Sequence, residues 1–125
     1  MTPSLGRLVL YTKKVPEMVA FYRDHFGYAE YTREGDRITE LAPPGPGGVA
    51  LLLHPAAKSQ RVGQAQVKLV FDVPDVRAFA HAAEKSGLIF GPIHDGGGYD
   101  FANSKDPSGN SVQISSRAFV GKGTA

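Results

Sequence analysis

The chain has 125 residues, and 42% of them are hydrophobic, which is enough for the core of one domain and too few for two ordinary ones. It contains no cysteine, so disulfides, zinc–thiolate sites and thiol nucleophiles are excluded. The net charge is only +2, with 14 basic residues scattered among 12 acidic ones, and we therefore expect no nucleic-acid partner. No apolar run approaches the roughly 18 residues of a membrane span, so we expect no membrane partner and a cytoplasmic location.

The first half of the chain begins with an alternating segment, "RLVLY" from Arg7, which predicts a strand. An amphipathic helix follows and ends at glycine, with Pro16 suited to its first turn. Its apolar stripe consists of Val15, Met18, Val19, Tyr22 and Phe26. Two extended segments, "YAEYTR" and "RITELA", precede the glycine-rich turn "GPGG" and the strand "VALLLH".

The second half repeats this order from "KLVFD" at Lys68. Asp75 is a good helix N-cap and Gly87 a good stop, and the stripe between them is Val76, Phe79, Ala80 and Ala83. Extended segments "LIFGP" and "YDFANS" follow, and then the turn "DPSGN" opens the strand "SVQIS". In that turn Asp106 can accept hydrogen bonds from the backbone ahead of it.

The two halves are in register, because 61 residues separate both Arg7 from Lys68 and Leu52 from Gln113. A long repeat that occurs twice predicts two similar modules. We therefore expect an α+β fold in which two tandem βαβββ modules form a curved, mostly antiparallel eight-stranded sheet around a cup. We expect one domain over residues 1–125, with module one at about 5–60 and module two at about 64–118.

Strand alternation assigns the two faces of the predicted sheet. One face is apolar and should lie under the helices: Leu8, Leu10, Leu51, Leu53, Leu69, Phe71, Val112 and Ile114. The other face mixes aliphatic, aromatic, cationic, amide, hydroxyl and imidazole groups. Such a mixture suits a ligand pocket, although an antiparallel sheet facing plain water is mixed as well. Tyr11, Tyr99 and Phe101 are possible cup walls, and the glycine-rich "GPIHDGGGYD" could close over a pocket or be an ordinary loop.

Three features are the basis of a family resemblance: the two βαβββ modules, "FYRDHFGY" at the end of the first helix and "DPSGNSVQI" at the start of the last strand. In these features the chain resembles the glyoxalase / bleomycin-resistance / extradiol-dioxygenase superfamily, which is also named after the vicinal oxygen chelate fold. The resemblance covers roughly 5–116. Its members include metal-dependent lyases, isomerases and dioxygenases, thiol transferases and metal-free proteins that sequester antibiotics.

In metal-using members of that superfamily, His, Glu or Gln ligands come from four strands, and the resemblance places them here at Arg7, Leu52, Lys68 and Gln113. Arg7 stays protonated, Lys68 is normally an ammonium and Leu52 has no donor atom. Only Gln113 could ligate a cation. We therefore expect no metal at the usual site and no cofactor, and Gln113 becomes an amide that binds a ligand or pairs with a neighbouring strand.

The expected ligand-binding residues are Arg7, Tyr11, Leu52, His54, Lys68 and Gln113. Arg7 and Lys68 either clamp an anion together or are neutralised by Glu40 or Asp72 in a buried ion pair. His54 either contacts the ligand or is a solvated histidine at the rim.

The resemblance implies a small-molecule-binding protein whose ligand is an anionic or polar organic compound, with antibiotics as one class. Binding would serve sequestration or metal-free chemistry, and the sequence leaves open whether the protein is an enzyme. The alternatives are a metal-dependent lyase or dioxygenase with displaced ligands such as His54, Glu40 and Gln113, and a dimeric scaffold with a vestigial cup. A homodimer is expected from the family.

Overall fold

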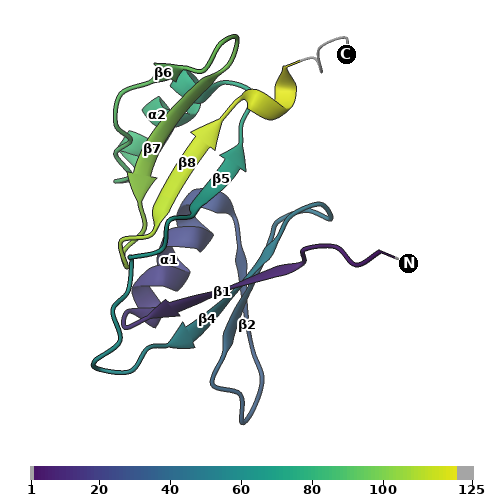
Figure 1. The fold of residues 1–125 in the computed structure, drawn as a ribbon, viewed down its shortest axis with the longest axis vertical. Helices are drawn as coiled ribbons and strands as arrows, with labels where there is room; N and C mark the ends of the chain where they lie inside the picture. The colour runs from purple at the N-terminus through teal and green to yellow at the C-terminus, as the bar shows by residue number, and fades with distance from the viewer. Residues whose placement is uncertain (1, 121–125) are drawn as a thin grey trace. The chain divides into compact units, whose positions relative to one another are not determined.

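The computed structural model describes residues 2–120 and divides the chain into two units, Met1–Gln64 (unit 1) and Ala65–Ala125 (unit 2) (Figure 1). The described elements of unit 1 are β1 (Arg7–Thr12), α1 (Val15–Phe26), β2 (Ala29–Thr32), β3 (Thr39–Ala42) and β4 (Ala50–Pro55). Those of unit 2 are β5 (Lys68–Asp72), α2 (Val76–Lys85), β6 (His94–Asp95), β7 (Asp100–Lys105), β8 (Ser111–Ser115) and the short 3-10 helix η1 (Arg117–Phe119). Among these residues no helix combines the length and the apolar character that crossing a membrane requires.

The two units have the same strand topology. The order is β1-β4-β3-β2 in unit 1 and β5-β8-β7-β6 in unit 2. In each sheet the first strand pairs in parallel with the last strand of the unit, and the other two pairings are antiparallel. The predicted α+β class and the tandem βαβββ modules are confirmed, with the eight strands hydrogen-bonded as two mixed sheets of four.

The register of the parallel pairs reproduces the sequence repeat. In unit 1 Val9 lies opposite Leu52, and in unit 2 Val70 lies opposite Gln113. Both members of the second pair stand 61 positions after those of the first. The repeat is therefore a repeat of backbone register, and equivalent side chains occupy equivalent places in the two sheets.

The buried face of each sheet is the face that alternation predicts. Leu51 and Leu53 are at most 2% exposed in unit 1, and Val112 and Ile114 are fully buried in unit 2. On the opposite faces Val9 and Val70 are about half exposed. Helix α1 contacts β2, β3 and β4, and α2 contacts β7, so each helix covers the apolar side of its own sheet (Figure 1).

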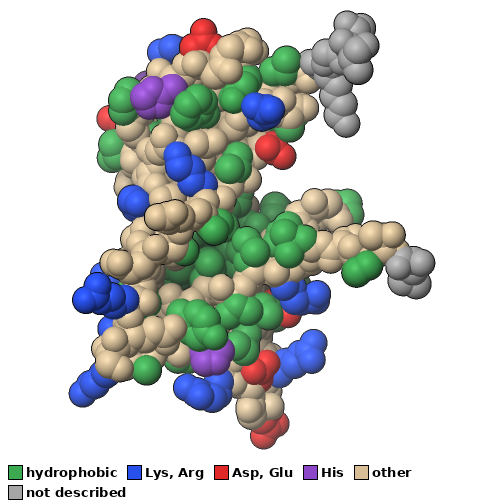
Figure 2. All heavy atoms as spheres, in the orientation of Figure 1, with side chains coloured by type: hydrophobic (Ala, Val, Ile, Leu, Met, Phe, Trp, Pro, Cys, Tyr) green, Lys and Arg blue, Asp and Glu red, His purple; other side chains and the backbone are tan. Residues whose placement is uncertain are grey.

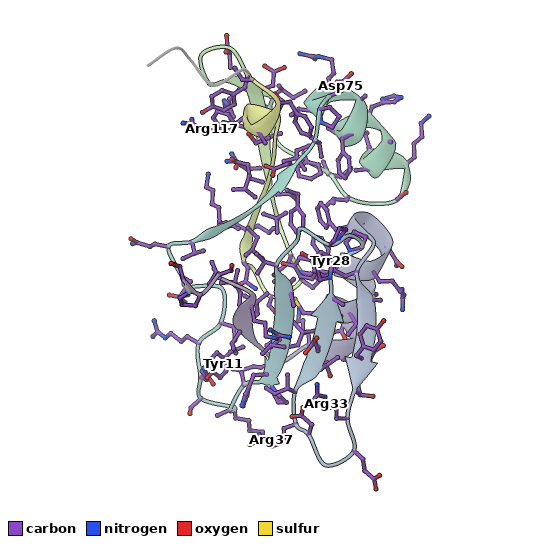
Figure 3. All side chains as sticks on the ribbon, turned by 90° about the vertical axis from the view of Figure 1, so that its right-hand side faces the viewer. Tyr11, Tyr28, Arg33, Arg37, Asp75 and Arg117 are labelled. Carbon is purple, nitrogen blue, oxygen red and sulfur yellow. The ribbon has the colours of Figure 1, made fainter. Side chains whose placement is uncertain are left out.

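Helix α1 forms where the apolar spacing predicts it. Met18, Val19 and Tyr22 are its buried residues, and Pro lies in its first turn, where a missing N–H breaks no helical bond. The chain leaves the helix through Gly27 at φ 72°, a left-handed conformation that favours glycine. The next residue, Tyr28 (Figure 3), is buried and donates its hydroxyl to the carbonyl of Val49 at 2.9 Å; burial raises the pKa of this phenol.

Helix α2 begins at the predicted cap. The side chain of Asp75 (Figure 3) accepts a hydrogen bond from the Ala78 amide at 3.0 Å, which satisfies one of the free donors of the first turn. The helix ends at Lys85, and Gly87 follows at φ 91°. Val76 and Ala83 are its buried residues, so the predicted stripe faces the sheet.

The turn before β8 is built around a buried carboxylate. Asp106 is 4% exposed, and its Oδ1 atom accepts hydrogen bonds from the amides of Ser108 and Asn110, each at 2.9 Å. Its Oδ2 atom accepts a third from the Asn110 side chain at 2.7 Å. Gly109 has φ 87°, as the exit of the predicted turn requires.

The predicted extended segment "LIFGP" is not a strand. Strand β6 consists of only His94 and Asp95. One amide of the preceding segment, that of Gly91, donates to the carbonyl of Asn103 at 2.8 Å. Pro92 has no N–H to continue the ladder, so regular pairing with β7 starts two residues later.

Candidate functional site

A hollow lies on the face of each sheet that is turned away from α1 or α2. The unit 2 hollow has a volume of about 690 Å³ and is lined by Val70, Asp72, Gly96, Gly97, Tyr99, Gln113, Ser115, Arg117, Ala118 and Val120. The unit 1 hollow has a volume of about 590 Å³ and is lined by Arg7, Tyr31, Thr32, Arg33, Asp36, Ile38, Glu40 and Leu52. Both volumes fall within the range of roughly 300–1,000 Å³ that small-molecule sites occupy.

In the unit 2 hollow the sheet supplies alternate residues of two neighbouring parallel strands. Val70 and Asp72 project from β5, and Gln113 and Ser115 from β8, where they lie directly opposite. Strand alternation sends all four side chains to the face away from α2. They combine an apolar surface, a carboxylate, a carboxamide and a hydroxyl.

The second wall of the unit 2 hollow comes from η1 and the glycine-rich segment before β7. The side chain of Arg117, labelled in Figure 3, donates from Nη1 to the Tyr99 hydroxyl at 3.0 Å. Its guanidinium carbon lies 5.2 Å from the Tyr99 ring centroid. The Arg117 amide donates to Ser115 Oγ at 3.1 Å, which ties the start of η1 to the end of β8. A guanidinium and a phenol ring are thus held together at one edge of the hollow.

The glycine-rich segment allows the backbone at Gly96 to pack closely against the Tyr99 ring. A Cβ atom added to Gly96 would lie 2.4 Å from the Tyr99 ring, so only glycine leaves the ring where it is. Asp95 accepts hydrogen bonds from the amides of Gly97 at 2.9 Å and Gly98 at 3.3 Å. The Gly97 bond first, and then the Gly98 bond, hold the pKa of the Asp95 carboxyl below its ordinary value.

Gln113 belongs to a hydrogen-bonded group of three side chains in unit 2. Gln113 Nε2 donates to Asn103 Oδ1 at 2.9 Å, and Lys68 Nζ donates to the same oxygen at 3.1 Å. Asn103 lies on β7 directly opposite Gln113. Asn103 is not among the predicted site residues, although it lies in the predicted extended segment "YDFANS", which precedes the turn and the last strand.

The unit 1 hollow holds two of the expected ligand-binding residues, Arg7 and Leu52. Arg7 Nε lies 3.9 Å from Glu40 Oε1, and the two side chains are 60% and 31% exposed. The pair is therefore a solvated one rather than a buried ion pair, and such pairs contribute about 0–1 kcal/mol. Arg33, in the loop between β2 and β3 (Figure 3), adds a second guanidinium to this hollow.

Tyr11 and His54 form a ring pair on the same face of unit 1. They lie opposite each other on β1 and β4, with ring centroids 4.9 Å apart and planes tilted by 42°. His54 Nδ1 lies 2.9 Å from the Pro55 carbonyl oxygen. Neither residue lines the hollow of its unit, so their expected contact with a ligand stays a prediction, as does an anion clamp joining Arg7 of unit 1 to Lys68 of unit 2.

The residues at the four positions that the resemblance assigns to a metal ion do not fit one. Unit 1 supplies Arg7 and Leu52, a permanent cation and a hydrocarbon. In unit 2 the Lys68 ammonium donates to the oxygen that also binds the Gln113 amide. Within residues 2–120 no three His, Cys, Asp or Glu side chains come together in a way that could hold a metal ion.

Charged side chains of both signs lie on the face drawn in Figure 2. On the face drawn in Figure 2, the described Lys and Arg side chains are interspersed with other types and form no continuous basic field. A field of that kind is what binding to a phosphate backbone requires.

Solved structures with the same fold cover nearly the whole chain. UcmS2 is 18% identical with a TM-score of 0.75, covering 93% of this chain and 99% of that one. Lactoylglutathione lyase from Agrobacterium tumefaciens is 20% identical with a TM-score of 0.71, covering 98% and 100%. TnmS3, described as an antibiotic binding protein from Streptomyces sp. CB03234, is 17% identical with a TM-score of 0.74, covering 90% and 94%. At these identities the likeness shows the fold alone.

A search among curated proteins finds no match. A family model does match, over residues 4–114, and it describes the Glyoxalase/Bleomycin resistance protein/Dioxygenase superfamily. Because this match spans most of both units, the chain belongs to that superfamily.

Proposed function

We propose that the protein binds a small polar or anionic organic molecule in the unit 2 hollow, without a metal ion at Arg7, Leu52, Lys68 and Gln113. The observation that carries this proposal is the make-up of the hollow. It has a volume of about 690 Å³, apolar surface from Val70 and polar groups of several kinds at its wall and floor. Small-molecule sites have this mixture of apolar lining and a few placed polar groups.

The wall formed by Arg117 and Tyr99 suits a flat acid. One Arg117 nitrogen donates to the Tyr99 hydroxyl, and a guanidinium has four further N–H donors. These can bind a carboxylate with two parallel hydrogen bonds. Tyr99 and Val70 offer ring and methyl surface beside that point, so an aromatic carboxylate is the simplest ligand for this wall.

Binding of this kind would serve sequestration or metal-free chemistry. TnmS3, which shares the fold, is described as an antibiotic binding protein, and this supports binding of an organic compound as a use of the scaffold. The metal-dependent alternative, with displaced ligands such as His54, Glu40 and Gln113, requires metal-ligating side chains that come together, and residues 2–120 contain no such group of three His, Cys, Asp or Glu side chains.

Isothermal titration calorimetry with naphthoic acid in a chelator-containing buffer tests the proposal. We expect saturable binding that Arg117→Gln weakens about tenfold or more, because the variant loses a charge-assisted hydrogen bond. Arg77→Gln is the matched control, because Arg77 is an exposed cation on α2. Absence of binding to naphthoic acid and to a panel of organic acids, phosphates and antibiotics, or binding only after a divalent metal is added, would contradict the proposal.

We further propose that the protein forms a homodimer. β1 and β5 are terminal strands of their sheets, and terminal strands present backbone groups that another chain can pair with. Light scattering after size exclusion should give about twice the chain mass of 13.3 kDa; a mass of one chain at micromolar concentration would contradict this.

A further inference from the structure

We propose that Lys68 and Asn103 fix the orientation of the Gln113 carboxamide, so that the unit 2 hollow selects ligands that carry a hydrogen-bond donor. The proposal rests on the function proposed above and adds a chemical class to it: aromatic carboxylates with a hydroxyl or N–H group on the ring. Lys68 acts in this account as a positioning residue, because it is not among the residues that line the hollow.

The orientation begins at Lys68, whose ammonium can only donate hydrogen bonds. It lies 3.1 Å from the side-chain amide of Asn103, so the Asn103 atom that faces it has to be the oxygen. With the amide turned over, an NH₂ group would face the ammonium, and two donors would oppose each other. The cation therefore determines which end of the Asn103 amide points toward it.

The orientation of the Asn103 amide in turn determines the orientation of the Gln113 carboxamide. The same Asn103 oxygen lies 2.9 Å from the Gln113 amide, and an oxygen can only accept, so the Gln113 atom that faces it has to be the NH₂ group. Gln113 Oε1 is then the other end of the carboxamide. Among the described residues it has no hydrogen bond, and Gln113 lines the hollow. Gln113 Oε1 therefore presents a hydrogen-bond acceptor to the hollow.

The neighbouring groups of the hollow favour the same ligand class. The carboxylate of Asp72 lines the hollow, and an ionised carboxylate is an acceptor only. Arg117 supplies donors at the η1 wall, so the hollow combines acceptors on its floor with donors on its wall. A ligand with a carboxylate at one end and a hydroxyl or N–H at the other matches both.

Lys105 provides an internal control for the charge of Lys68. Its side chain donates to Ser111 Oγ at 3.1 Å, and Ser111 lies opposite Lys68 in the parallel register. Lys105 and Lys68 are therefore both cations near Ser111 in unit 2, but only Lys68 donates to Asn103. Replacing either removes one positive charge, whereas only the loss of Lys68 frees the two amides to turn over.

The test uses two probes, hydroxynaphthoic acid and its methoxy counterpart with the same ring positions, each titrated by calorimetry. The two share the carboxylate and the ring, and only the hydroxy compound can donate to Gln113 Oε1. We expect the native protein to prefer the hydroxy acid roughly fivefold to tenfold, the usual effect of one neutral hydrogen bond. In Lys68→Met we expect the preference to fall to about twofold or less, because the carboxamide then presents either end.

Three further variants separate orientation from charge and from folding. Lys68→Arg should restore the preference, because a guanidinium also only donates, and Lys105→Met should keep it. Asn103→Asp should keep it as well, because a carboxylate accepts from both neighbours, whereas Asn103→Leu should abolish it. This last variant tests the proposal a second time without altering Lys68.

The outcomes separate this inference from the proposed function. If the native protein binds both probes and Lys68→Met and Asn103→Leu keep the native preference, the orientation proposal is wrong and the binding function stands. If Lys68→Met and Lys105→Met lower the preference equally, charge rather than orientation is responsible, and the proposal is again wrong. If the native protein binds neither probe, both proposals fail.

Discussion

Unit 1 and unit 2 place equivalent residues on the helix-free faces of two sheets with the same topology, yet the two faces differ in chemistry. The parallel pairs β1–β4 and β5–β8 have the same register, so Leu52 and Gln113 occupy equivalent positions. The residue opposite each on the next strand is Glu40 in unit 1 and Asn103 in unit 2. A cation on the first strand, Arg7 or Lys68, lies near that residue in both units.

The two units differ in the side chain that lies between the cation and the residue opposite it, which is Leu52 in unit 1 and Gln113 in unit 2. In unit 2 Asn103 Oδ1 accepts hydrogen bonds from Gln113 Nε2 at 2.9 Å and from Lys68 Nζ at 3.1 Å, so the Gln113 carboxamide belongs to a network of three side chains. In unit 1 the hydrocarbon side chain of Leu52 cannot form a hydrogen bond, and Arg7 Nε lies 3.9 Å from Glu40 Oε1 in a solvated pair. Backbone register thus decides where side chains project, and the residue types at these three positions decide whether they form a hydrogen-bonded network. Variants at equivalent positions in the two units test how far this equivalence extends.

The largest effect is expected in the two cores. Leu53 and Ile114 stand 61 positions apart and are both fully buried. We expect Leu53→Ala and Ile114→Ala each to lower the free energy of unfolding by about 2–5 kcal/mol, measured by urea denaturation. A loss below about 1 kcal/mol in either variant would show that the two positions are not equivalent parts of a packed core.

The turns that lead into β4 and β8 should respond to different substitutions. The β8 turn depends on hydrogen bonds to the Asp106 carboxylate, and we expect Asp106→Ala to cost about 2–3 kcal/mol. The β4 turn depends on a glycine, since a Cβ at Gly48 would lie 2.5 Å from Pro43 Cβ. Gly48→Ala should therefore cost about 1–3 kcal/mol by overpacking. Thermal unfolding of both variants measures this, and an unchanged midpoint for Asp106→Ala would contradict the account of its turn.

A smaller effect is expected at the charged pair of unit 1. Because both side chains are partly solvated, Glu40→Gln should change the free energy of unfolding by less than about 1 kcal/mol. The same denaturation experiment at low and high salt measures the change. A loss above about 2 kcal/mol would mean that the pair is far less solvated than its exposure indicates.

The smallest effect is a pH dependence of the glycine-rich segment in unit 2. The amides of Gly97 and Gly98 lower the pKa of Asp95 from its ordinary value of 3.8. The folded form therefore binds the proton less tightly, so the contribution of these bonds is complete above pH 3.8 and is lost as the pH falls through the lowered pKa. Amide NMR signals of Gly97 and Gly98 should titrate with that lowered pKa, and Asp95→Asn should abolish the titration. A midpoint at or above 3.8 would contradict the assignment.

Much of the fold could be predicted because it depends on short-range patterns. Alternation placed Leu53 and Ile114 in the cores, helical spacing placed Met18 and Tyr22, and the repeat gave both modules. The prediction of a strand at "LIFGP" was wrong. The apolar residues of this segment suit a strand, but Gly91 and Pro92 interrupt pairing with β7 until β6 begins. That outcome depends on backbone hydrogen bonding, which an apolar pattern does not record.

The candidate site could be predicted only in part. Arg7, Leu52 and Gln113 line the hollows of their units, as strand alternation indicated. Asn103 and Arg117 were missed because their roles come from contacts across strands and from η1, which no periodicity marks. The sequence pattern offered Glu40 or Asp72 as partners of Arg7 and Lys68, and it did not indicate that Lys68 reaches Asn103, which lies across β8 on β7.

Amide NMR of the isotope-labelled protein, titrated with naphthoic acid in the presence of a chelator, tests the central claim most directly. The account predicts saturable shifts at Val70, Tyr99, Gln113 and Arg117, which line the unit 2 hollow. Equivalent positions in unit 1, such as Val9 and Leu52, should shift less. Shifts that appear only after a divalent metal is added, or none at the unit 2 residues, would contradict metal-independent binding in this hollow.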